Sequence, residues 1–362
     1  MPLQPRKNMA GLEKGTHGGL DYAELERKGI APDELLDFSV CTNPVGVPPG
    51  ILQPVPLKEV SRYPDSQSTG LKRVIAAETG VPEDRILAGS GSTEIIRLAA
   101  LAYLDEADTA LIIEPTYGEY RLACEISGCR VLTFTASAKD DFRLDVDALV
   151  SVILNEKPKA VFLCNPNNPT GYYLDVPGFQ RILAAIGDAL VVLDEAYVSF
   201  VRERWDSTQF IDSANLLVVR SMTKDYAIAG LRLGYGMAKT EITGTLGSVC
   251  PPWNVNAVAQ QAGIAALQDR EYLEKSREMV HREKAYLTGQ IEKLGLRCVP
   301  SASNFFLVEV GHAADFRSRL LQRKLLVRDC TSFGLPGYLR IAPGNRSKNR
   351  RLVAALKELV NE

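Results

Sequence analysis

The chain has 362 residues, of which 46% are hydrophobic and 24% charged, the balance of an ordinary globular protein with one large or two medium domains. Its formal net charge of −2 and the lack of a long basic run give no electrostatic footprint for nucleic acid. No stretch approaches the roughly 20 apolar residues of a membrane span, and the first residues lack the apolar core of a signal peptide. We therefore expect a protein without a nucleic-acid or membrane partner.

The seven cysteines are scattered through the chain, and no two of them have Cys-x-x-Cys spacing. This pattern indicates neither a disulfide framework nor a structural zinc site, and it is typical of a reducing cytoplasm. The three histidines are far apart in the sequence, which argues against histidine-rich metal chemistry. We expect a cytoplasmic protein that uses no metal.

The first part of the chain is rich in proline and glycine, which disfavours long helices. We expect residues 1–50 to form an arm that belongs to a small domain and wraps over a surface or a partner subunit. From 67 to about 250 the sequence predicts alternating helices and strands, typical of a layered α/β domain. The predicted helices lie at 67–80, 92–104 and 117–128, and the predicted strands at 85–91, 109–115, 130–136, 160–166, 190–197 and 215–221.

The pattern changes near residue 251. A long helical stretch at 256–295, with room for one break, is followed by predicted strands at 305–310, 325–330 and 338–343 and a terminal helix at 346–360. We interpret this part as a smaller α+β unit. The predicted division is an arm at 1–50, a large domain at 51–250 and a small domain at 251–362.

Polar motifs follow several of the predicted strands, and the carboxyl ends of such strands are where open α/β sheets bind ligands. Gly89 to Glu94 joins a strand to a helix, where free N–H groups favour an anion, although a plain capped helix start explains the same letters. Asn168 lies in a rigid loop with two prolines, although a sharp turn explains the same letters. Asp194 directly follows an apolar run, where a carboxylate usually needs a cationic partner, although taken alone this stretch favours a cap of the following segment. Lys224 ends another strand, and a desolvated lysine can form a Schiff base, although most lysines are simply solvated.

These features occur in one order: phosphate cradle, asparagine loop, strand-end aspartate, strand-end lysine and following arginine. The set resembles the pyridoxal-phosphate-dependent aminotransferases of fold type I, and the resemblance covers nearly the whole chain. It implies an α/β fold with a mostly parallel sheet flanked by helices in a large domain, plus a smaller α+β domain. It also implies pyridoxal 5′-phosphate (PLP) as cofactor.

The resemblance assigns a role to each motif. Lys224 would hold the cofactor covalently, and Asp194 would pair with the protonated pyridine nitrogen. Asn168 and Tyr197 would hydrogen-bond to the phenolate oxygen of the ring, and Tyr117 would stack on its face. The cofactor phosphate would be held by Gly91, Ser92, Thr93, Ser221, Thr223 and Arg232, and by Tyr63 from the neighbouring subunit of a homodimer.

Three further segments concern the substrate. Thr16 to Gly19, Leu36 to Gly46 and Leu326 to Leu335 resemble the threonine-phosphate decarboxylases of cobalamin biosynthesis, close relatives of the histidinol-phosphate aminotransferases. The resemblance implies a lyase that decarboxylates O-phospho-L-threonine, a small phosphorylated amino acid. The substrate-binding residues would be His17, Gly18, Asn43, Asn168, Arg328 and Arg340.

Simpler explanations exist for two of these residues, because His17 could be an ordinary histidine of a surface arm and Arg328 could form a salt bridge with Asp329. The segment Ile341 to Arg346, "IAPGNR", departs from the decarboxylase pattern toward the aminotransferase form. Three alternatives to the main reading therefore stay open: a histidinol-phosphate aminotransferase, a decarboxylase of O-phospho-L-serine, and a binding protein that kept the cofactor site.

Overall fold

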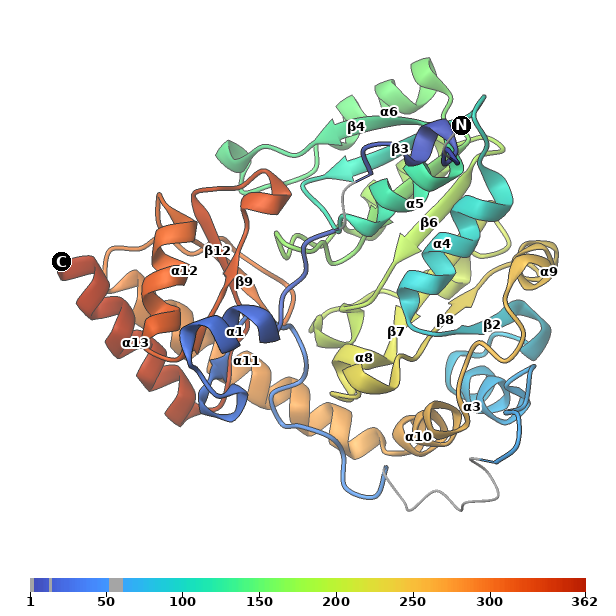
Figure 1. Cartoon of the computed structure of the whole chain (residues 1–362). Helices are drawn as coiled ribbons and strands as arrows, with labels where there is room; N and C mark the ends of the chain where they lie inside the picture. Colours follow the sequence, from blue (N-terminus) through green and yellow to red (C-terminus); the bar gives the residue numbers. More distant parts are fainter. Residues whose placement is uncertain (1–2, 13–14, 52–60) are drawn as a thin grey trace.

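The computed structural model describes residues 3–12, 15–51 and 61–362. A seven-stranded sheet with helices on both faces forms the larger part, and a smaller α+β part lies beside it (Figure 1). The strand order is β2-β8-β7-β6-β5-β3-β4, and all neighbours are parallel except those of β8. The strands are β2 (Ile86–Gly89), β3 (Thr109–Glu114), β4 (Arg130–Thr135), β5 (Ala160–Cys164), β6 (Leu190–Asp194), β7 (Leu216–Ser221) and β8 (Gly234–Met237).

The helices cover both faces of this sheet, and each face has its own apolar core. Helices α3 (Thr69–Thr79), α6 (Val146–Glu156), α7 (Val176–Ala185) and α10 (Ala257–Gln268) pack on one face, which we call the α7 face. Helices α4 (Ser92–Tyr103), α5 (Glu119–Ser127) and α9 (Thr240–Val249) pack on the other, which we call the α5 face.

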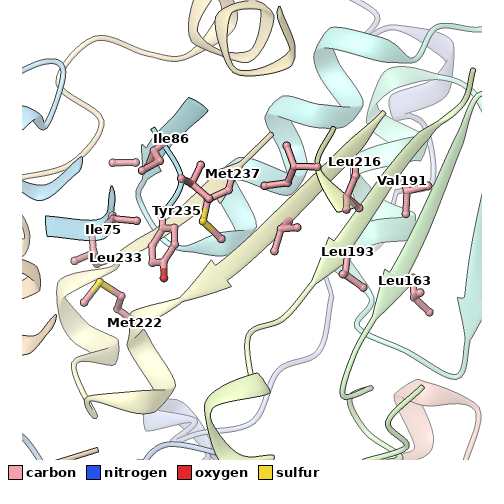
Figure 2. Packing of buried hydrophobic residues seen from close by; sticks show 14 of the residues in the cluster. Ile75, Ile86, Leu163, Val191, Leu193, Leu216, Met222, Leu233, Tyr235 and Met237 are labelled. Carbon is pink, nitrogen blue, oxygen red and sulfur yellow. The ribbon is translucent and has the colours of Figure 1, made fainter. Parts of the chain in front are cut away.

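Successive strand residues point to alternate faces. In β6, Val191 and Leu193 join the core of the α7 face, and Leu190 and Val192 join that of the α5 face. Figure 2 shows Val191 and Leu193 packed among the residues of the α7 face. By the same alternation, Asp194 points toward α5, so the strand period sets the direction of this carboxylate.

The smaller part contains the antiparallel sheet β11-β12-β9 and a parallel pair, β1 with β10. Its core joins these strands to α11, α12 and α13. Helix α11 begins where α10 ends, at Asp269, whose side chain caps it, so the predicted long helical stretch is broken once. The elements are β1 (Leu36–Asp37), β9 (Phe306–Glu309), β10 (Leu325–Leu326), β11 (Arg328–Asp329), β12 (Tyr338–Ile341), α11 (Arg270–Glu292), α12 (Ala313–Gln322) and α13 (Arg346–Asn361).

The N-terminal residues touch both parts of the molecule. Asn8 donates from Nδ2 to two carbonyl oxygens of α5, and η1 (Lys7–Met9) lies against that helix. Farther along, α1 (Tyr22–Lys28) is tied to α12 by the ion pair between Glu24 and Arg317. Residues 15–19 therefore run from one part to the other, as the dark blue segment in Figure 1 shows.

The predicted fold class is confirmed: a mostly parallel sheet flanked by helices, with a smaller α+β part. Gly80 ends α3 with a φ of 74°, the left-handed conformation expected of a C-cap glycine. Strand β8, short and rich in glycine, was not predicted. The division at residues 50 and 250 stays a prediction, and 52–60 lie outside the described residues. Within the described ranges, no helix is long and apolar enough to cross a membrane.

Replacing Leu193 tests whether the core of the α7 face holds the end of β6, where Asp194 lies. It is fully buried, and we expect Leu193→Ala to lower the free energy of unfolding by about 2–5 kcal/mol, through lost contacts and the cavity left behind. Leu154, 54% exposed on α6, is the matched control, and its replacement by alanine should change stability by about 0.5 kcal/mol or less. Urea denaturation followed by circular dichroism measures both, and equal losses would contradict the assigned core.

Candidate functional site

The carboxyl ends of β5, β6 and β7 lie side by side, because Cys164 is in register with Asp194 and Asp194 with Val219. A cavity of about 70 Å³ lies beyond these ends. A wider cavity of about 800 Å³ adjoins it. Both cavities are lined by Thr93, Tyr117, Asn168, Tyr197, Lys224 and Arg232.

Asp194 ends β6 with its side chain facing α5, and it is 3% exposed. Its Oδ2 accepts a hydrogen bond from the Tyr120 hydroxyl at 2.7 Å, and its Oδ1 accepts from the Ala196 N–H at 2.9 Å. Burial raises the pKa of Asp194 to about 6, although both hydrogen bonds act in the opposite direction. A buried carboxylate without an ion-pair partner among the described residues is a receptor for a cationic group of a ligand.

Lys224 lies in α8 (Met222–Asp225), a single turn that begins directly after β7. Burial lowers the pKa of Lys224, and the cations Arg340 and Arg232 act in the same direction, which favours the neutral, nucleophilic amine. Asn43 makes two hydrogen bonds to the main chain of this turn. Its N–H donates to the carbonyl oxygen of Lys224, and its Nδ2 donates to the carbonyl oxygen of Asp225. Asn43 does not line either cavity.

An anion cradle lies at the first turn of α4. Gly91 precedes the helix with a φ of 81°, and a Cβ there would approach Arg232 Nη2 to 2.8 Å. A Cβ on Gly234 would approach Ser92 N to 2.5 Å, so glycine leaves the free N–H groups accessible. The hydroxyls of Ser221 and Thr223 lie 2.8 Å apart and line the smaller cavity. Hydroxyls, free N–H groups and a guanidinium together suit a phosphate.

Aromatic and amide side chains form the walls between the two cavities. The Tyr117 hydroxyl is 3.0 Å from Thr93 Oγ1. Tyr197 is 6% exposed, and its ring meets the Phe305 ring edge-on at 4.9 Å. Asn168 is 6% exposed and accepts a hydrogen bond from Arg340 through Oδ1. This arrangement fits a flat ring with polar substituents.

Arg328 and Arg340 lie opposite each other on the antiparallel strands β11 and β12, and both line the wider cavity. They are 7% and 5% exposed, and neither has a carboxylate partner among the described residues. Burial and the neighbouring Arg340 guanidinium lower the pKa of Arg328. Like charges directly opposite each other destabilise a sheet, so an anion placed between them would stabilise this pair.

Residues 15–18 line the wider cavity. Arg328 donates to the carbonyl oxygens of Thr16 and His17 at 2.6 and 3.3 Å. Gly18 packs so closely that a Cβ would lie 2.7 Å from Ser39 O. The structure therefore brings His17 and Gly18 into the same cavity as Lys224 and the two arginines.

Tyr63 lies outside both cavities. It is 76% exposed, and its ring stacks on the ring of Trp253 at 4.2 Å.

Three side chains around the two cavities were not predicted from the sequence: Tyr120, Glu119 and Arg97. Tyr120 and Glu119 follow Tyr117 within one turn in "EPTYGEY", but only the start and phase of α5 determine which of them meets Asp194.

Comparison with known proteins identifies the family. The aminotransferase class I and II family matches residues 35–356. A histidinol-phosphate aminotransferase of Symbiobacterium thermophilum is 36% identical over 349 residues, which are 95% of each chain. The histidinol-phosphate aminotransferase of Moorella thermoacetica is 34% identical, over 94% of this chain and 89% of its own.

Solved structures show the same fold. The histidinol-phosphate aminotransferase of Clostridium acetobutylicum superimposes with a TM-score of 0.84 at 28% identity, over 90% of this chain and 99% of its own. The L-threonine-O-3-phosphate decarboxylase of Porphyromonas gingivalis gives 0.80 at 27% identity, over 91% and 100%. The histidinol-phosphate aminotransferase of Sinorhizobium meliloti, solved with pyridoxal-5′-phosphate, gives 0.84 at 21% identity, over 99% and 98%.

The expectation of a threonine-phosphate decarboxylase, and with it a lyase of cobalamin biosynthesis, is wrong. Several curated relatives at 33–37% identity are histidinol-phosphate aminotransferases, and they align over 83–95% of the chain. The expectation depended on three short segments, whereas the cofactor motifs are common to both groups of enzymes. The segment at Ile341 to Arg346 had already indicated the aminotransferase form.

The cofactor expectation is confirmed, and the donor groups around Asp194, Lys224 and the first turn of α4 fit its ring nitrogen, aldehyde and phosphate. The chain belongs to the class I and II aminotransferases, the PLP-dependent enzymes of fold type I.

Proposed function

We propose that this chain is an aminotransferase that moves the amino group of histidinol phosphate to 2-oxoglutarate. The named relatives at 33–37% identity support this substrate. The structural observation that carries the proposal is the buried pair Arg328 and Arg340, which faces the cavity of Lys224 without a carboxylate partner among the described residues. A phosphate dianion satisfies both guanidiniums, and the carboxylates of 2-oxoglutarate do the same in the second half of the reaction.

Bound PLP supplies an aldehyde for the amino group and a protonated ring that withdraws electrons from the substrate. Asp194 would stabilise the positive charge on the ring nitrogen, and the Tyr120 hydroxyl, which donates to Asp194 Oδ2, favours the ionised form of that carboxyl. Lys224 would hold the cofactor, and its amine, whose pKa is lowered by burial, would act as the base that takes and returns the proton at the substrate Cα.

The remaining residues bind and orient. Tyr117 would pack on the face of the cofactor ring, and Asn168 and Tyr197 would donate to its phenolic oxygen. The cofactor phosphate would be held by Gly91, Ser92, Thr93, Ser221, Thr223 and Arg232. A cytoplasmic location, expected from the scattered cysteines, is part of this proposal.

The reaction itself is the first test. Purified holoenzyme given histidinol phosphate and 2-oxoglutarate should form glutamate. Arg328→Gln should raise KM for histidinol phosphate by about 10–100-fold, the effect of losing charged hydrogen bonds worth about 1.5–3 kcal/mol. The control is Arg351→Gln, an exposed arginine of α13. Absence of glutamate formation by the wild-type protein would refute the proposed function.

Tyr120→Phe tests the state of Asp194. A carboxyl with a raised pKa is charged only above that pKa, so its attraction for the protonated ring is present at higher pH and lost as pH falls through about 6. Without the Tyr120 hydroxyl the pKa of Asp194 rises further, and the loss begins at higher pH.

We expect Tyr120→Phe to weaken PLP binding about tenfold or more at pH 7, measured by absorbance titration, with a smaller effect at pH 8.5. Tyr103→Phe is the control, because the Tyr103 hydroxyl has no hydrogen-bond partner among the described residues. An unchanged pH dependence in Tyr120→Phe would contradict the assigned role.

We also propose a homodimer in which Tyr63 reaches the cofactor phosphate of the neighbouring subunit. Its exposed ring, stacked on the half-exposed Trp253 and outside both cavities, supports this arrangement. Sedimentation should give about twice the 39.6 kDa of one chain. Tyr63→Phe should keep the dimer and weaken PLP binding about three- to tenfold, the effect of one lost hydrogen bond. A monomer that binds PLP at full strength would contradict this proposal.

A further inference from the structure

Glu119 is a buried carboxylate on the wall of the wider cavity. It is the first residue of α5, two positions after Tyr117, and it is 4% exposed. Its Oε1 is 3.1 Å from His17 Nε2, and its Oε2 accepts from Arg97 Nη2 at 2.7 Å. The His17 and Arg97 side chains are 50% and 51% exposed, so the buried acid is held by two partners that solvent reaches.

The two carboxylates that line this cavity differ in what they bind. Glu94 accepts from Ser90 N–H and from Asn254 Nδ2, both at 2.7 Å, and so holds the loop before α4. Glu119 instead faces the residue 15–18 segment, where a Cβ on Gly15 would come within 3.0 Å of its Oε1. Of these two carboxylates, Glu119 is therefore the one that can orient the side chain of His17.

The contact with Glu119 sets the proton arrangement of His17. A carboxylate only accepts hydrogen bonds, so His17 Nε2 carries the proton. In the neutral ring, Nδ1 then has a free lone pair, and it has no hydrogen-bond partner among the described residues. The ring lies 5.7 Å from the Tyr117 ring, and the His17 carbonyl accepts from Arg328. His17 thus stands between the ring-stacking tyrosine and the phosphate-binding arginine.

We propose that Glu119 is a specificity-determining positioning residue, which holds His17 so that its Nδ1 accepts the N–H of an imidazole ring on the substrate. This inference rests on the proposed function. With the substrate amine beside Lys224 and the phosphate between Arg328 and Arg340, the heterocycle is the group left to contact this wall. A donor such as glutamate, which has no ring N–H, makes no use of it.

A purely structural ion pair makes a different prediction. The Arg97–Glu119 pair joins an arginine side chain that is 51% exposed to a carboxylate side chain that is 5% exposed, and removing one partner of a buried charge destabilises the structure around it. Its loss would affect all substrates alike. Recognition through His17 affects only substrates with a ring N–H, so the KM values for two amino donors separate the two explanations.

Glu119→Gln is the decisive variant. Its amide oxygen stays with Arg97, and its NH₂ group turns toward His17, which can then only accept at Nε2. The proton moves to Nδ1, where it opposes the substrate N–H. We expect KM for histidinol phosphate to rise about tenfold and KM for glutamate to change less than about twofold. Glu125→Gln, on the same helix and outside the cavity, should change neither.

His17→Ala gives a second measurement. It should reproduce the selective KM rise, and adding Glu119→Gln to it should have no further effect, because both act through one contact. If wild-type enzyme transfers the amino group of histidinol phosphate but Glu119→Gln raises both KM values equally, or neither, this inference is refuted. If wild-type enzyme does not use histidinol phosphate, the proposed function fails first.

Discussion

Charged side chains that are buried without a counter-ion among the described residues are the constraint on which this site depends. Asp194 is buried at the end of β6 with hydrogen bonds but without an ion-pair partner in the described part of the chain, and Arg328 and Arg340 lie opposite each other on neighbouring strands. Burying charges in this way costs stability unless a partner arrives. In the proposed function, the cofactor would bring a protonated ring to the acid, and the substrate would bring an anion to the arginines. The charges of the folded chain would then be complementary to those of its cofactor and substrate.

The sheet explains how these groups meet. The parallel strands β5, β6 and β7 end at one edge, which places the asparagine loop, Asp194 and the Lys224 turn around one small cavity. Because side chains alternate along β6, Asp194 points toward α5, where the Tyr120 hydroxyl donates a hydrogen bond to it. The arginines come from the sheet β11-β12-β9, and residues 15–18, two of whose carbonyl oxygens accept from Arg328, line the wider cavity with them. The side chains proposed to bind the ligand thus come from different elements, and no single element makes the site.

The sequence predicted the strand-end residues because apolar runs and turn residues are local signals. Asp194 and Lys224 each follow such a run, and their order along the chain identified the cofactor. Tyr120 and Glu119 were missed, since their roles depend on where α5 begins and how it rotates against β6. Strand β8 was missed because "GYGM" carries a weak strand pattern and is held by pairing with distant residues. The reaction was misjudged, because decarboxylation and transamination share the cofactor site and differ in substrate orientation, which short motifs do not encode.

The proposed site requires PLP to be tethered at Lys224 with its ring nitrogen toward Asp194. Reduction of the holoenzyme with borohydride, followed by peptide mass analysis, tests the tether most directly. We expect one pyridoxyl adduct per chain, on the peptide that contains Lys224, and none in Lys224→Ala. An adduct on another lysine, or no adduct in protein saturated with PLP, would contradict it.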